Sequence, residues 1–111
     1  MENIRARVVC TPKAGQHDAA IELAKKMTAV CQADPGVVDY HWYLDRDSGS
    51  LVCHESFTSS QAFIDHIPRN PDQADFMTVV DVVGAEIYGD PTDELRAIFD
   101  QMGATYHQTI A

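Results

Sequence analysis

Residues 37–57 read VVDYHWYLDRDSGSLVCHESF and contain the clearest strand pattern in the sequence. Two runs rich in β-branched and aromatic residues, 37–46 and 51–57, flank the turn sequence Asp47-Ser48-Gly49-Ser50, which predicts a β-hairpin. If Arg46 pairs with Leu51, the numbers of cross-strand partners sum to about 97, and Trp42 is expected opposite Glu55.

The alternation along these two runs predicts large side chains on both faces of the hairpin. One face is expected to carry Val38, Tyr40, Trp42, Leu44, Cys53, Glu55 and Phe57, and the other Asp39, His41, Tyr43, Asp45, Val52, His54 and Ser56. A sheet with aromatic residues on both faces is expected to be covered on both. Helices can cover one face, and we expect a second copy of the chain, in a two-fold homodimer, to cover the other.

The flanking sequence predicts the remaining elements. Strand alternation marks residues 3–11 and 82–88, and a helical apolar period marks residues 16–33. Three further helices are expected, the first capped by Thr58, the second opened by Asn70 and Pro71, and the third opened by Asp90 and ended by Gly103; residues 105–110 can add a short strand. This order predicts an α+β fold, a ferredoxin-like antiparallel sheet with helices on one face, in a dimeric α+β barrel. Residues 1–111 are expected to form one domain, with a core in 1–90 and the last helix and strand in 91–111.

Composition excludes several functions. Seventeen acidic and eight basic residues give a net charge of −9, which argues against nucleic acids and anionic membranes as partners. There is no apolar run of the ~20 residues that cross a bilayer, and the N-terminus lacks a secretion signal pattern. We therefore expect a cytoplasmic protein. The three cysteines, without CxxC spacing, are expected to be buried reduced thiols.

Several short motifs resemble the antibiotic biosynthesis monooxygenase family of dimeric α+β barrels, which includes quinol monooxygenases and haem-degrading proteins. They are Pro35-Gly36, Tyr40, His54-Glu55-Ser56-Phe57 and Phe63-Ile64-Asp65-His66-Ile67. The resemblance extends through Tyr88. It implies a cofactor-free monooxygenase that oxidises a quinol or polyphenol with dioxygen, using no metal or flavin. A deprotonated phenol can itself give an electron to dioxygen, so an apolar pocket, a base and hydrogen bonds to the oxyanion suffice.

The candidate catalytic residues are His66 and Glu55. His66 suits proton abstraction from a phenol because histidine titrates near neutral pH; the alternative is a histidine that binds the carbonyls at a helix end. Glu55 would orient His66 or bind the substrate hydroxyl, unless it is paired structurally with Arg7 or Tyr40. Tyr40, Trp42 and Phe63 would line the pocket for a small aromatic substrate, although aromatic residues on strands often belong only to the core.

Two other functions remain open, a non-catalytic small-molecule-binding barrel and a haem-binding or haem-degrading protein. The haem-degrading branch has an asparagine in its first strand and a tryptophan in its helical region. Here the first strand carries Arg7-Val8, and Trp42 lies in a predicted strand. No phosphate-binding or nucleophile-elbow motif is present. His41 and His54 share one face without the carboxylates that would complete a metal site, so no metal is expected.

Overall fold

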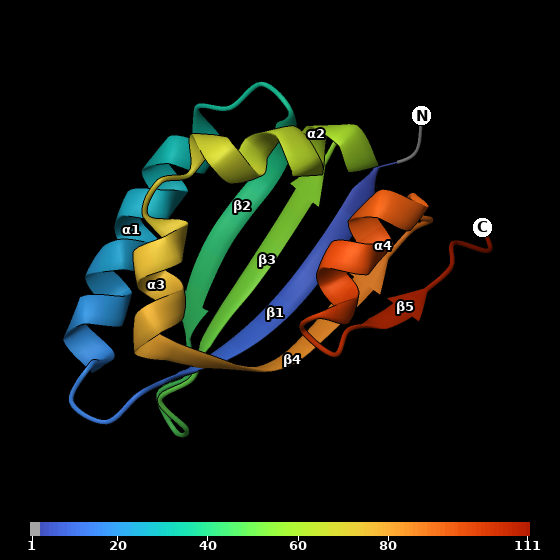
Figure 1. The fold of residues 1–111 in the computed structure, drawn as a ribbon. Coiled ribbons are helices and arrows are strands. Elements are labelled where there is room, and N and C mark those ends of the chain that lie inside the picture. Colours follow the sequence, from blue (N-terminus) through green and yellow to red (C-terminus); the bar gives the residue numbers. More distant parts are fainter. Residues whose placement is uncertain (1–2) are drawn as a thin grey trace.

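A computed structural model describes residues 3–111 of the chain (Figure 1). The elements in chain order are β1 (Ile4–Pro12), α1 (His17–Gln32), β2 (Val37–Leu44), β3 (Leu51–Phe57), α2 (Ser60–His66), the 3-10 turn η1 (Ile67–Arg69), α3 (Gln73–Val79), β4 (Val80–Tyr88), α4 (Asp93–Asp100) and β5 (Thr105–His107). The strands form one sheet in the order β2-β3-β1-β4-β5, and the helices lie on one of its faces. The predicted α+β class and ferredoxin-like arrangement are therefore confirmed.

The sheet is mixed rather than antiparallel throughout. β2, β3, β1 and β4 pair antiparallel, as expected, but β5 runs parallel to β4. The connection explains this difference. In the chain, α4 lies between β4 and β5 and carries the backbone back along the sheet, so that β5 runs in the same direction as β4; helical crossovers of this kind join parallel strands.

The hairpin forms with a register two residues away from the predicted one. Trp42 pairs with Cys53 rather than Glu55, Tyr40 pairs with Glu55, and the strands end at Leu44 and Leu51. The connecting loop is longer than predicted because its first residue, Asp45, binds the backbone of the loop: its N–H donates to the Ser50 carbonyl (2.9 Å), and its carboxylate accepts from Asp47 N–H (3.0 Å). Gly49 completes the loop with a φ of +77°, which favours glycine. Because the shift is even, side chains keep their predicted faces.

Val38 is the exception to the predicted faces. The register of β2 shifts between Val37 and Asp39, so Val38 occupies a bulge and is 55% exposed. Val37, not Val38, packs against the core. The prediction that placed Val38 on the inner face was therefore wrong, because strict alternation fails at a bulge.

Three helix starts also differ from the prediction. Ser59, not Thr58, caps α2 by accepting a hydrogen bond from Ala62 N–H (3.1 Å). Thr92, not Asp90, caps α4. Asn70 does not cap α3, which begins at Gln73 after the η1 turn. A helix start depends on which side chain reaches the free N–H groups, and neighbouring polar residues offer equivalent candidates in the sequence.

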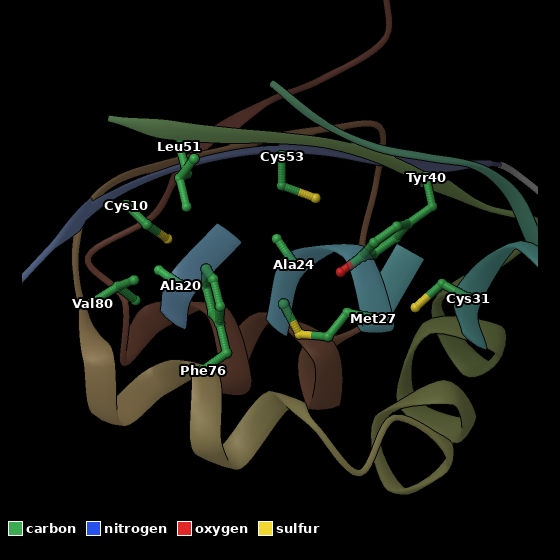
Figure 2. Packing of buried hydrophobic residues seen from close by; sticks show 10 residues of the cluster. All are labelled: Cys10, Ala20, Ala24, Met27, Cys31, Tyr40, Leu51, Cys53, Phe76 and Val80. Carbon is green, nitrogen blue, oxygen red and sulfur yellow. The ribbon is translucent and has the colours of Figure 1, made fainter. Parts of the chain in front are cut away.

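The core lies between the sheet and the helices (Figure 2). One apolar cluster, under α1 and α3, includes all three cysteines, which are buried and free as predicted. A second cluster joins Phe57 and Phe63 to Leu95 and Phe99 of α4, so the C-terminal helix belongs to the core. The opposite face of the sheet carries large exposed side chains, with Tyr43 54% and Val83 62% exposed. Across residues 3–111, no helix is both long and apolar enough to cross a membrane.

Candidate functional site

A cavity of about 60 Å³ lies between the inner face of the sheet and the helices, several times the ~10–15 Å³ that a single water needs. Its wall includes all five residues that the sequence singled out, namely Tyr40, Trp42, Glu55, Phe63 and His66. The structure therefore brings together three strand residues and two residues of α2 at one place, on the helix-covered face.

Glu55 is a buried carboxyl group in the wall of this cavity. It lies on β3 opposite Tyr40 and is 8% exposed. Its Oε2 accepts a hydrogen bond from the Cys53 thiol at 3.5 Å. Burial raises the pKa of Glu55 to about 7, and the Cys53 hydrogen bond lowers it only in part. Near neutral pH, Glu55 can therefore either donate or accept a proton.

The expected structural partners of Glu55 are engaged elsewhere. Arg7 lies on the outer face of β1, where its guanidinium binds Glu86 at 3.2 Å. In the pairing of β1 with β3, Arg7 also lies opposite His54 and not opposite Glu55. The Tyr40 hydroxyl accepts a hydrogen bond from Trp42 Nε1 at 3.1 Å. Of the alternatives that the sequence left open, pairing with Arg7 does not occur, because an odd offset along β1 puts the two side chains on opposite faces.

Tyr40 and Trp42 form a polar pair within an aromatic wall. They are two residues apart on β2 and so share a face. Burial, and then the charge of Glu55, raise the pKa of Tyr40 far above its ordinary value, so its hydroxyl stays protonated. The Trp42 ring packs on Phe76 of α3, with ring centroids 4.8 Å apart. This part of the wall therefore offers a flat apolar surface and one hydroxyl.

His66 is the last residue of α2 and is 3% exposed. Its ring lies against Phe57 and Phe63, at centroid distances of 4.9 Å and 5.6 Å. Nδ1 lies 3.6 Å from the Cys31 thiol, so its contact is with a side chain of α1 rather than with a helix-end carbonyl. Burial lowers the pKa of His66, opposed by the Asp34 carboxylate and assisted by Arg69. At neutral pH the ring is therefore uncharged and able to accept a proton.

The position of His66 depends on a close approach between α2 and the chain that enters β2. A Cβ atom on Gly36 would lie 3.0 Å from Ala62 Cβ, which is closer than such atoms normally come. Glycine at this position lets α2 pack tightly on the chain before β2. Thr58 N–H also donates to the Gly36 carbonyl at 3.0 Å, which ties the end of β3 to the same point.

Sequence reasoning missed part of the wall. The cavity is also lined by Met27 of α1, Phe76 and Met77 of α3, and Ile98, Phe99 and Met102 from the C-terminal helix and the turn after it. The apolar face of the last helix was predicted, but nothing in the sequence indicated that it would reach the cavity. Within residues 3–111, no three His, Cys, Asp or Glu side chains are placed to hold a metal ion.

Comparisons with known proteins agree on the fold. The family model described as antibiotic biosynthesis monooxygenase matches residues 4–78. A search of the curated proteins finds no match. Among solved structures, MupZ from Pseudomonas fluorescens is similar with a TM-score of 0.84 and 14% identity, over 100% of this chain and 93% of that one.

Two further structures are similar over a smaller part of the chain. Rv0793 from Mycobacterium tuberculosis has a TM-score of 0.70 and 22% identity, over 83% of this chain and 97% of that one. A variant of SnoaB, a cofactor-independent oxygenase from Streptomyces nogalater, has a TM-score of 0.67 and 14% identity, over 83% of this chain and 96% of that one. At these identities the likeness concerns the fold.

Proposed function

Because the chain belongs to the antibiotic biosynthesis monooxygenase family, we propose that it is a homodimeric, cofactor-independent monooxygenase that oxidises a quinol or polyphenolic small molecule with dioxygen. The observation that carries this proposal is the meeting of two proton-transfer groups in one apolar cavity. His66 is neutral and Glu55 has a pKa of about 7, and both line the same cavity. Such a pair suits general acid–base chemistry near neutral pH.

The proposed reaction begins with the substrate ring against Trp42 and Phe63. His66 removes the phenolic proton: the O–H bond breaks and an N–H bond forms on the imidazole. The Tyr40 hydroxyl, or protonated Glu55, donates a hydrogen bond to the oxyanion, which is strong in a site that excludes water. The phenolate then transfers an electron to dioxygen, and the resulting phenoxyl radical and superoxide combine to form a C–O bond. Loss of the C–H proton at that carbon, with cleavage of the O–O bond, forms a carbonyl and releases the second oxygen atom as water.

The overall reaction needs no external reductant. A hydroquinone and one dioxygen give a hydroxyquinone and one water, so that one oxygen atom enters the product and the substrate supplies all the electrons. A substrate ring needs more room than the cavity of about 60 Å³ provides. Met77 and Met102 lie on its wall, and methionine side chains adapt readily to a ligand.

The test is oxygen uptake with a panel of hydroquinones, with ¹⁸O₂ used to follow one labelled atom into the product. We expect His66→Ala to lower kcat/KM by ~10²–10⁴-fold, the usual contribution of a positioned acid–base group. His17→Ala is the matched control, because His17 is exposed at the start of α1. Absence of uptake in the wild type, or undiminished uptake in His66→Ala, would contradict the proposal.

A non-catalytic binding protein would use the same cavity and would show a thermal shift with hydroquinones but no oxygen uptake. The contact of Glu55 favours catalysis over this alternative, because a thiol is a weak donor and leaves the carboxyl group able to exchange a proton. Haem binding is less favoured, because a cavity of about 60 Å³ is far smaller than the macrocycle.

The homodimer is proposed from the exposed face of the sheet. Three large apolar side chains are exposed on this side of the strands: Tyr43, which lies beside the His41 and His54 pair, and Val83 and Tyr88 of β4. A second copy packed on this face would remove them from water and would leave the cavity untouched on the other face. Sedimentation equilibrium measures the association directly, and a monomer at high concentration would contradict it.

A further inference from the structure

His66 separates the cavity from a second hollow. This hollow opens on the surface, has a volume of about 210 Å³, and is lined by Cys31, Asp34, Arg69 and three apolar residues besides His66. Among the described residues, His66 is the one that lines both spaces. Its Nδ1 is on the hollow side, because it lies 3.6 Å from the thiol of Cys31, which lines the hollow only. Because the ring also lines the cavity, we assign its other nitrogen, Nε2, to that side.

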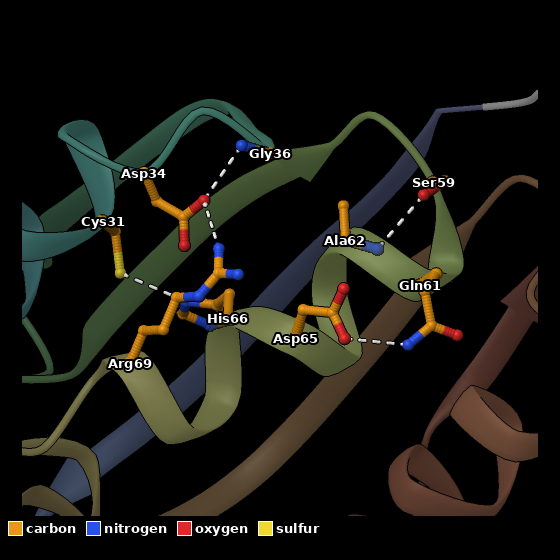
Figure 3. A network of polar contacts seen from close by, with 9 residues as sticks. All are labelled: Cys31, Asp34, Gly36, Ser59, Gln61, Ala62, Asp65, His66 and Arg69. Atoms are coloured by element: carbon orange, nitrogen blue, oxygen red, sulfur yellow. Dashed lines mark hydrogen bonds and ion pairs between the residues drawn. The ribbon is translucent and has the colours of Figure 1, made fainter.

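Asp34 is a buried carboxylate in this hollow, with its side chain 6% exposed. Its Oδ1 accepts hydrogen bonds from Gly36 N–H (2.9 Å) and from Arg69 Nη1 (3.4 Å). Its Oδ2 is buried and has no hydrogen-bond partner. In Figure 3 this second oxygen points away from Gly36, toward the side of the hollow where Arg69 and His66 lie. A buried carboxylate oxygen without a donor is costly, which indicates that it interacts with a donor during function.

We propose that Asp34 is a positioning residue for His66 and provides the exit for the proton that His66 takes up in the cavity. The inference rests on the proposed function. The phenolic proton joins the cavity-side nitrogen, and Nδ1–H releases its proton through water in the hollow, whose volume of about 210 Å³ has room for it, with Asp34 Oδ2 as the acceptor. Solvent takes the proton from the hollow and returns one proton to the cavity, where the second oxygen atom of dioxygen leaves as water. The proton count at His66 is then restored for the next turnover.

The groups around His66 agree with this direction of transfer. From the hollow, the Asp34 carboxylate raises the pKa of His66 and Arg69 lowers it. From the cavity, the ring of Tyr40 lies with its centroid 6.4 Å from that of His66, and Glu55 lines the same cavity. Cys31 of α1 stays a neutral thiol because burial, and then Glu55, raise its pKa to about 12. Asp34 is thus the negative charge on the hollow side that stabilises a protonated His66.

The variant Asp34→Asn tests this arrangement with little disturbance. It keeps the Oδ1 acceptor for Gly36 N–H, and it removes the charge and the unpaired Oδ2. The matched control is Asp65→Asn, which makes the same charge change one residue before His66. Asp65 is exposed and accepts a hydrogen bond from Gln61, on the outer side of α2 (Figure 3).

The first readout is the His66 titration, followed by NMR of the ring nitrogens. We expect Asp34→Asn to lower the pKa of His66 and Asp65→Asn to change it much less. Arg69→Gln should raise it, and this exposed site carries little risk to folding. An unchanged pKa of His66 in Asp34→Asn and Arg69→Gln would overturn the proposal, whether or not the protein turns over a substrate.

The second readout is oxygen uptake with a hydroquinone. We expect kcat of Asp34→Asn to fall by roughly 10-fold with KM unchanged, a part of the ~10²–10⁴-fold effect of a positioned acid–base group. Added formate, a small carboxylate that fits the hollow, should restore most of the loss, whereas a purely structural defect would not respond. Unchanged kcat in Asp34→Asn would overturn the exit route. If the wild type shows no uptake but the His66 titration responds to Asp34, the oxygenase assignment fails and the pairing of the two residues stands.

Discussion

The two faces of the sheet use the same residue types in opposite surroundings. On the inner face Glu55 is buried beside a thiol, whereas on the outer face Glu86 is half-buried and binds the guanidinium of Arg7. On the inner side His66 is buried among aromatic rings, whereas on the outer face His41 binds Asp39 at 2.7 Å. The comparison teaches that burial, and not residue type, makes the inner groups suited to proton transfer.

The largest difference between the faces should be in packing energy. Phe57 is fully buried on the inner face, between α2 and β1, so Phe57→Ala should lower the free energy of unfolding by about 3–5 kcal/mol. Val38→Ala is the matched control at the exposed bulge of β2 and should change it by less than about 0.5 kcal/mol. Urea unfolding measures both. Equal effects would mean that the inner face is not the core.

The next difference concerns pH. The folded pKa of Glu55 is about 7, above its ordinary value of 4.5, so the folded state binds the proton more tightly than the unfolded state. Glu55 therefore lowers stability progressively as pH rises from 4.5 through 7, by about 3 kcal/mol once the group is fully ionised. We expect Glu55→Gln to be more stable than the wild type at pH 8.5, with the advantage lost near pH 4.5.

The comparison residue on the outer face is Glu86. Its ion pair with Arg7 is about 40% exposed, so Glu86→Gln should change the free energy of unfolding at pH 8.5 by no more than about 1 kcal/mol. His66 acts in the opposite sense to Glu55: its pKa is lowered, so its contribution to stability is present above 6.5 and is lost as pH falls below that value. The difference in the free energy of unfolding between the wild type and each variant, measured as a function of pH, distinguishes the effect of Glu55 from that of His66.

A smaller effect is expected on the dissociation constant of the proposed homodimer, which would form through the outer face of the sheet. If a second copy covers this face, Tyr43→Asp should weaken the dimer by about 2 kcal/mol, or roughly 30-fold in Kd, because a buried tyrosine often dominates an interface. Sedimentation measures Kd. Asp65→Asn, which changes a charge on the helix side, is the control and should leave it unchanged.

The smallest effect is expected for the ion pair on the outer face. Arg7 and Glu86 are each about 40% exposed, and exposed pairs contribute about 0–1 kcal/mol. Arg7→Gln should therefore change the free energy of unfolding by no more than about 1 kcal/mol, measured in urea at low salt. A loss of several kcal/mol would show that Arg7 supports the buried face, and would remove the distinction between the two carboxylates.

Much of this architecture was predictable because it depends on local pattern. Alternation along residues 37–57 predicted the hairpin and nearly all of its face assignments, and those assignments survived a register error of two residues. Helix starts were less predictable, since Thr58 and Ser59 are adjacent hydroxyl residues and only the folded backbone selects between them. The bulge at Val38 was not predictable, because nothing in the local pattern marks it.

The candidate site was predictable in its members but not in its surroundings. Tyr40, Trp42, Glu55, Phe63 and His66 were singled out together, and all five line one cavity. The contact of Glu55 with the Cys53 thiol was not predicted, and whether Arg7 could reach Glu55 depended on how β1 lies against β3. The pairing of Nδ1 with Cys31, which is 35 residues away in the chain, gave no sequence signal at all.

The sequence by itself determined which side chains of each strand share a face and where the chain turns, because both follow from backbone geometry over a few residues. Tertiary structure decided that β1 lies between β3 and β4, that α4 closes the cavity, and that Asp34 lies behind His66. These relations join residues far apart in the chain. They depend on how whole elements pack, and the same packing removes Glu55 and His66 from water and so changes their chemistry.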